Sequence, residues 1–368
     1  MKTLLIALLL LTTGILYSQP AQPDECNDLF KPIAAARSTD SRSEAMGMTS
    51  VSSWDNINTS FDNPAGLSTI EGIQASGTYA SAYYQYDSAY YTYFGIAAKV
   101  NRYLNFKLSR FEFDANEEFQ YPFSNNIYDR KHTITTFGYA AEPIKNWHIG
   151  ANFKLLETQF VQGTKYSNFM GDVGILGRIV LGNEKHVLKP GLSVSNVSGT
   201  TFEFLNEENI YPIFGRLGVS YEYTSTDWTM LDTLPIVSLI AQVDIEDDFT
   251  VYYRRAFKMG LEASFAKFVY LRAGYYRQTV SEWLCSVSGD IYTPNAFISA
   301  LTYGIGIEAP LREFTNLLIR IKIDYARMME PELYNEELIP DNEYESDIFQ
   351  SLTVRLDWKF GNSSRKSS

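Results

Sequence analysis

Residues 316–326 of this chain read NLLIRIKIDYA, and they decide the fold. From the second position onward every other residue is apolar, while three of the four positions between them carry Arg320, Lys322 and Asp324. Alternation with a period of two is the pattern of a β-strand with one apolar and one polar face. Three charges on one face would be unfavourable in a packed core, so this stretch predicts a strand whose polar face meets water.

The same alternation recurs along the chain. It is as regular in 147–155, where Trp147 and Phe153 lie opposite His148 and Lys154. Ten residues of a strand tilted by about 40° span roughly 25 Å, the height of the apolar band on an outer-membrane barrel, whereas the mean strand of a soluble protein has about five or six residues. The expected strands, fourteen in number, are 72–86, 90–99, 103–111, 133–141, 147–157, 169–181, 187–196, 213–224, 235–244, 253–264, 267–277, 299–308, 316–326 and 348–360.

The connections between these expected strands alternate in length. Long ones are expected at Glu112–His132, Thr158–Phe169, Val197–Pro212, Gln278–Ile298 and Arg327–Asp347. Most of the others are short; the first connection is shorter, and the eighth longer, than strict alternation requires. Outer-membrane barrels join strands by short periplasmic turns and longer outer loops, so the sequence predicts an all-β fold, a transmembrane antiparallel β-barrel of about 14 strands.

The polar strand faces are expected to line the lumen of this barrel. A Lys or Arg that faces lipid at mid-depth costs about 2–4 kcal/mol, so charged positions must point inward. The predicted lumen-facing polar residues are His148, Lys154, Arg320, Lys322 and Asp324.

The two ends of the chain differ from the strand-rich middle. Residues 1–19 combine Lys2 with a short apolar run and predict a signal peptide, hence export to the outer membrane of a Gram-negative cell. We expect a lead and plug-like segment over 20–71 with one short helical turn, a barrel over 72–360 and a polar tail over 361–368. The tail follows the last aromatic residue, so the barrel assembly machinery, an expected partner, must tolerate it or recognise the strand internally.

Charge and cysteine content set further limits. The formal net charge is −12, which argues against nucleic acid as a partner. Between Glu330 and Asp347 there are eight acidic residues and no basic one, which predicts a solvated loop or, alternatively, a contact with divalent cations at a charged cell surface. Outside the cytoplasm Cys26 and Cys285 could form one disulfide or stay unpaired.

Several short motifs resemble a known family. Ser41-Arg42, Ala45-Met46-Gly47 and Asn63-Pro64-Ala65-Gly66-Leu67 are similar to the entry signature of the PorV/PorQ family, relatives of the FadL-type long-chain fatty-acid transporters. The resemblance continues, in order along the chain, through 171–174, 191–196, 216–221, 271–275, 303–306 and 324–326.

The resemblance implies a fourteen-stranded outer-membrane barrel whose N-terminal segment lies in or under the lumen. It also implies one of two roles: a conduit for hydrophobic small molecules, or an accessory of type IX secretion that contacts secretion components or cargo proteins. The candidate plug or gating residues are Arg42, Gly47, Asn63, Pro64, Ala65, Gly66 and Leu67.

The sequence contains few residues in patterns typical of enzymes. The three His residues share no metal-binding or triad spacing, and no phosphate-binding loop or nucleophile elbow is present. We therefore expect no catalytic residue, no metal and no cofactor, and partners limited to outer-membrane lipid and those named above. The alternative hypothesis is a soluble, secreted, β-rich adhesin or interaction protein.

Overall fold

The computed structural model describes residues 38–81, 89–120, 127–161, 164–182, 184–197, 201–204, 207–210, 212–225, 229–230, 234–249, 255–279, 282–286, 289–293, 297–309, 319–329, 332–334 and 349–359. The predicted signal peptide (1–19), the predicted polar tail (361–368), Cys26 and most of the acidic stretch lie outside these residues, as does the side chain of Cys285. None of the described helices is long and apolar enough to cross a membrane.

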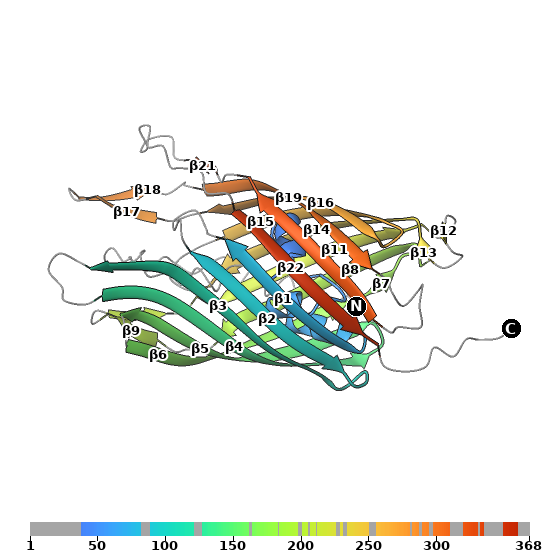
Figure 1. Ribbon diagram of the computed structural model, residues 1–368, viewed down its shortest axis with the longest axis horizontal. Coiled ribbons are helices and arrows are strands. Elements are labelled where there is room, and N and C mark those ends of the chain that lie inside the picture. Colours follow the sequence, from blue (N-terminus) through green and yellow to red (C-terminus); the bar gives the residue numbers. More distant parts are fainter. Residues whose placement is uncertain are drawn as a thin grey trace, which may run out of the picture.

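Fourteen antiparallel strands form a closed ring, which confirms the predicted all-β barrel (Figure 1). The ring closes where β1 pairs with β22, with Ile73 opposite Trp358. In chain order the ring strands are β1 (Ile73–Ser81), β2 (Tyr90–Lys99), β3 (Asn105–Gln120), β4 (Ile127–Ile144), β5 (Trp147–Val161), β6 (Thr164–Gly177), β8 (His186–Val197), β11 (Phe214–Thr224), β14 (Val237–Asp248), β15 (Arg255–Phe265), β16 (Val269–Thr279), β19 (Phe297–Ala309), β20 (Ile319–Met328) and β22 (Phe349–Trp358). Each corresponds to one expected strand.

The remaining strands are short. β7 (Ile179–Val180) continues the line of β6 along β8, and β21 (Glu332–Tyr334) pairs with β19 outside the ring. Three small hairpins complete the set: β9 (Thr201–Phe204) with β10 (Glu207–Ile210), β12 (Thr229–Met230) with β13 (Leu234–Pro235), and β17 (Glu282–Ser286) with β18 (Gly289–Thr293).

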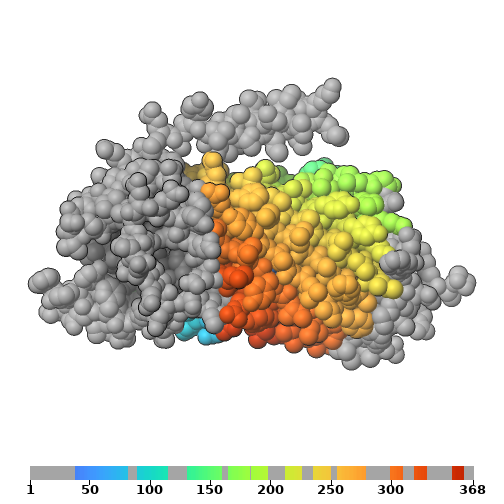
Figure 2. Space-filling model, turned by 90° about the horizontal axis from the view of Figure 1, so that it is seen from above, coloured from blue at the N-terminus to red at the C-terminus, as the bar shows by residue number. Residues whose placement is uncertain are grey.

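Side chains alternate between the two faces of the ring, as the sequence pattern predicts. In β20 Lys322 and Asp324 are buried, whereas Ile323 between them is 46% exposed. The outer face carries large apolar side chains, such as Leu261 and Ile307, and forms a continuous surface on the flank seen in Figure 2. An apolar outside around a polar inside is the arrangement expected of a barrel in lipid.

Two predicted long loops are wrong. Most of Glu112–His132 belongs to β3 and β4, and most of Thr158–Phe169 belongs to β5 and β6. The alternation stops before these strands do: past Leu108 the outward positions of β3 carry Arg110 and Glu112 instead of apolar residues. A strand that continues beyond the lipid band has water outside it, so its hydrogen-bonded ladder persists after the apolar pattern has ended.

Residues 38–70, here called the inner segment, lie inside the ring (Figure 1). They contain three short helices, α2 (Ser41–Ala45), η4 (Asn58–Phe61) and η5 (Pro64–Thr69), where one helical turn was predicted. Asp40 caps α2 by accepting from the Arg42 amide, and Asn63 caps η5 with Pro64 at its first turn. Side-chain capping and an N-terminal Pro account for helical turns in a stretch that has no helical periodicity.

Candidate functional site

Inward-facing glycines of the ring form a close seat for the inner segment. A Cβ built on Gly274 would lie under 3.0 Å from the backbone of Met46 and Gly47, and one on Gly150 would meet the backbone of Pro64 just as closely. Real side chains do not approach so closely, so the inner segment can lie here only against glycine. The seat glycines are Gly150, Gly174, Gly191, Gly218, Gly260, Gly274 and Gly304.

The seat gives the recurrent sequence motifs a physical role. Five of the seven seat glycines lie within the fragments that carry the family resemblance: 171–174, 191–196, 216–221, 271–275 and 303–306. Those fragments come from five different strands and meet one object, the inner segment. The sequence motifs contain these glycines, but sequence alone did not show that the glycines contact the same segment.

The Asn63–Leu67 turn fits directly into this seat. The Asn63 side-chain amide donates to the carbonyl oxygens of Val51 at 2.7 Å and of Ile175 at 3.1 Å, so it connects the inner segment with β6. Ala65 and Leu67 are fully buried. At Gly66, in contrast, an added Cβ would meet nothing closer than 3.7 Å.

Gly47, another predicted plug residue, needs to be glycine for two reasons. Its φ is +67°, in the left-handed region, and an added Cβ would lie under 3.0 Å from the carbonyl oxygens of Met259 and Tyr275. Its amide also donates to the Thr302 hydroxyl at 2.9 Å.

An ionic cluster holds α2 against the wall. Arg42 donates to both carboxylate oxygens of Glu262, at 2.9 and 3.1 Å. Arg272 donates to the same carboxylate at 2.6 Å and to Asp324 at 2.8 Å. Glu262 therefore lies between two buried guanidinium groups, and loss of one partner from such a buried pair costs about 3–5 kcal/mol.

A second ion pair holds the middle of the inner segment. Arg320 donates to Asp55 at 2.8 Å and lies 2.6 Å from Asp357 in the neighbouring strand. Burial by itself would raise the pKa of Asp55, but the charges of Arg320 and Arg355 outweigh it and hold that pKa below its ordinary value.

The other predicted lumen residues also lie inside the ring. The Nδ1 atom of His148 is 2.6 Å from the Ser68 hydroxyl. Lys154 lies 2.8 Å from Asp172 and 4.2 Å from the centre of the Phe61 ring, while Lys322 is buried beside Glu308 at 3.9 Å.

Sequence analysis missed several wall residues that hold the inner segment. Asp244 accepts from the amides of Ser50 at 2.6 Å and Val51 at 3.0 Å, and Thr353 accepts from the Ser41 amide at 2.9 Å. Both wall residues occupy inward positions of predicted strands, so the alternation could have identified them as lumen-facing. It could not indicate which inward polar residues reach the inner segment.

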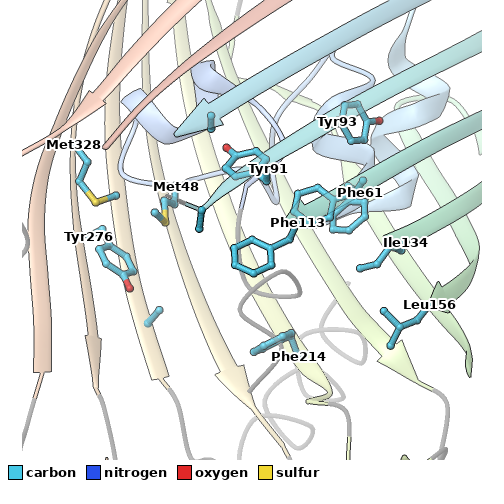
Figure 3. Packing of buried hydrophobic residues seen from close by; sticks show 14 of the residues in the cluster. Met48, Phe61, Tyr91, Tyr93, Phe113, Ile134, Leu156, Phe214, Tyr276 and Met328 are labelled. Atoms are coloured by element: carbon cyan, nitrogen blue, oxygen red, sulfur yellow. The ribbon is translucent and has the colours of Figure 1, made fainter. Parts of the chain in front are cut away.

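An apolar belt follows the seat toward the outer end of the ring, meaning the end where β1 ends and β22 begins. On β5, for example, Leu156 comes after Gly150 and Lys154 on the same inward face. Figure 3 shows belt side chains projecting inward from several strands, with Met48 and Phe61 of the inner segment among them. The larger wall residues of the belt are Tyr91, Tyr93, Phe111, Phe113, Ile134, Leu156, Met170, Phe214, Tyr276 and Met328.

Comparison with known proteins identifies the fold. No protein-family model matches the chain, and no curated protein matches it in sequence. Among solved structures it resembles the toluene transporter TodX of Pseudomonas putida (TM-score 0.52, 12% identity, 88% of this chain and 98% of that one). A Pseudomonas aeruginosa FadL homologue and the Ralstonia pickettii toluene transporter TbuX each match with a TM-score of 0.50 and 10% identity, over 88% of this chain and 98% of theirs.

The chain has the fold of FadL-like outer-membrane channels. Identities near 10% support the fold alone, and membership of the PorV/PorQ family stays a prediction. TodX and TbuX are toluene transporters by description.

Proposed function

We propose that this protein is an outer-membrane conduit for hydrophobic small molecules, with the inner segment as its gate. The observation that carries the proposal is the apolar belt, which lies inside a ring that is itself apolar outside, next to a segment that occupies the lumen. The descriptions of TodX and TbuX as toluene transporters support the same class of ligand.

The way the inner segment is held supports its role as a gate. Among the described residues no backbone-to-backbone hydrogen bond joins residues 38–70 to a ring strand; side-chain contacts and the glycine seat hold them. Such a segment can move without breaking the ladder of the barrel. A ligand would enter at the outer end, pack against the belt and pass when residues 41–68 shift, with Arg42, Gly47 and the Asn63–Leu67 turn as the gating contacts.

Cellular uptake of a hydrophobic fluorescent probe, N-phenyl-1-naphthylamine, tests the conduit. Leu156→Asn places a polar group in the belt, and we expect slower uptake than with the unaltered protein. Leu155→Asn, on the opposite face of β5, is the matched control and should leave uptake unchanged. Equal uptake by cells with and without the protein would refute the proposal.

Deletion of residues 41–68 tests the gate separately. If the inner segment closes the lumen, liposomes that contain the shortened barrel should leak a small hydrophilic solute faster than liposomes with the full chain. Unchanged leak and unchanged probe uptake from a barrel that still inserts would refute the gating role.

A type IX secretion role is the second candidate. The sequence resemblance to the PorV/PorQ family favours it, and the β17–β18 hairpin and β21, which lie outside the ring, offer strands for contact with another protein. Extraction in mild detergent separates the two roles: co-purified secreted proteins or secretion components favour this one, and co-purified lipid-like molecules favour the conduit. Recovery without detergent, and without a heat-dependent gel shift, would favour the soluble adhesin instead.

A further inference from the structure

Two neighbouring turns at the inner end of the ring, opposite the outer end, are hydrogen-bonded to each other. One joins β2 to β3 and the other joins β4 to β5, and they are here called the paired turns. The Arg102 guanidinium donates to the carbonyl oxygen of Glu142 at 3.0 and 3.1 Å and to that of Pro143 at 3.3 Å. The Glu142 amide donates back to the Arg102 carbonyl oxygen at 2.6 Å, and the Tyr139 hydroxyl donates to that of Tyr103 at 2.8 Å. The paired turns therefore form one fixed surface.

This surface carries two exposed basic side chains without an acidic partner. Among the residues that the structure describes, no carboxylate lies within 4.0 Å of Arg102 or Lys145. Lys359 at the same end is, in contrast, paired with Glu71 at 2.7 Å. The one acidic side chain of the paired turns, Glu142, accepts from a backbone amide of its own turn at 2.8 Å. Two positive charges are thus available to a partner, beside one carboxylate that is already hydrogen-bonded.

The paired turns adjoin the edge of the apolar outer face. On β3 and β4 the Phe106 ring lies 6.3 Å from that of Phe137 and 5.7 Å from that of Tyr139, measured between ring centres, and all three side chains are exposed. Tyr and Trp collect where the hydrocarbon of a membrane meets its headgroups. The paired turns also expose Val100 by 65% and Ile144 by 67%. Basic groups beside apolar and aromatic ones, at this boundary, match the headgroup and chains of a phospholipid.

We propose that the paired turns bind the headgroup of an anionic phospholipid from the membrane leaflet at the inner end of the ring. Arg102 and Lys145 would be the counter-ions of its phosphate. Guanidinium groups bind phosphate oxygens through paired N–H donors, and the Nη1 atom of Arg102 has no acceptor among the described residues. The acyl chains would pack against Phe106, Phe137 and Tyr139. The inference rests on the placement of the barrel in the outer membrane, and it is independent of the conduit and of the inner segment.

Lipid retention by the purified full-length barrel in an uncharged detergent tests the site. Native mass spectrometry compares dioleoylphosphatidylglycerol, which has a net negative charge, with dioleoylphosphatidylcholine, which has the same chains and phosphate but no net charge. We expect stronger retention of the anionic lipid. One basic residue at an anionic surface strengthens binding by about fivefold, so the double variant Arg102→Gln/Lys145→Gln should weaken retention of the anionic lipid by about 25-fold. Its retention of phosphatidylcholine should not change.

A paired lysine at the same end supplies the control. Lys359→Gln removes one positive charge whose partner is Glu71, and it should leave the retention of both lipids unchanged. A heat-dependent gel shift verifies that each variant is a folded barrel. Glycerol 3-phosphate, a phosphate ester without chains, should not displace the anionic lipid; displacement would assign the paired turns to a soluble phosphate ester and overturn the lipid site. Equal retention of the two lipids, or the same loss in Lys359→Gln as in the double variant, would also overturn it.

Discussion

The two sides of the ring meet the inner segment in opposite ways. On the β15 to β22 side the contacts are ionic and matched, as in Arg42 with Glu262 and Asp55 with Arg320. On the β2 to β5 side the inner segment packs around Leu67 and forms single hydrogen bonds, as in Ser68 with His148 and Ser60 with Asn152. The difference indicates that ion pairs anchor the inner segment on one side, while apolar packing and single hydrogen bonds hold it on the other.

The largest expected effect comes from breaking the anchored side. Glu262→Gln leaves Arg42 and Arg272 facing each other without their carboxylate, and we expect it to weaken the seating of the inner segment by about 3–5 kcal/mol. Faster leak of a small hydrophilic solute from liposomes measures this change. The barrel itself should still form, because its backbone ladder is untouched.

An exposed ion pair is the control for the Glu262 variant. Glu112→Gln removes the partner of Arg110 on the outer face, where both side chains are well exposed. Surface pairs contribute about 0–1 kcal/mol, so leak should not change. Equal leak from the two variants would show that Glu262 does not anchor the segment.

The next largest effect concerns the glycine seat. Gly274→Ala puts a Cβ under 3.0 Å from the backbone of Met46 and Gly47, so the inner segment must shift at a cost of about 1–3 kcal/mol. Gly77→Ala is its match on β1, because there the new methyl would meet nothing closer than 3.9 Å. Proteolytic cleavage within residues 38–70 should rise for Gly274→Ala only; equal rates in both variants would contradict a close seat.

Acid should loosen the inner segment through Asp55. Its pKa in the folded protein is lowered, so the Asp55–Arg320 contact contributes stability that is complete above the unfolded pKa of about 3.9 and is lost as the pH falls through the folded value. Liposome leak should therefore rise below about pH 4. In Asp55→Asn this contribution is absent at every pH, so a leak profile identical to that of the unaltered chain would refute the assignment.

The barrel could be predicted from the sequence because lipid-facing and lumen-facing residues alternate with a period of two along each strand. Each strand separates lipid from lumen, and residues such as Lys322 and Ile323 record that separation one position apart. The alternation did not predict where β3 ends and where β4 begins, because outside the lipid band neither face of a strand must be apolar. Nor did it predict which inward residues meet: the pairing of Arg42 with Glu262 joins positions 220 residues apart and depends on the closed ring.

The smallest expected effect separates two glycines of the inner segment that sequence analysis treated alike. Gly47 has φ of +67° and closely approaching neighbours, so Gly47→Ala should expel the turn and increase leak. Gly66→Ala adds a methyl with at least 3.7 Å of clearance in a helical turn, and we expect a change of only about 0.5–1 kcal/mol, in the stabilising direction. Asn63 and Pro64, which contact the wall, would then be the residues of the Asn63–Leu67 motif with a structural role, and Gly66 would not be required. Strong leak from Gly66→Ala would reverse that conclusion, because it would mean that the turn must flex at this glycine when the inner segment moves.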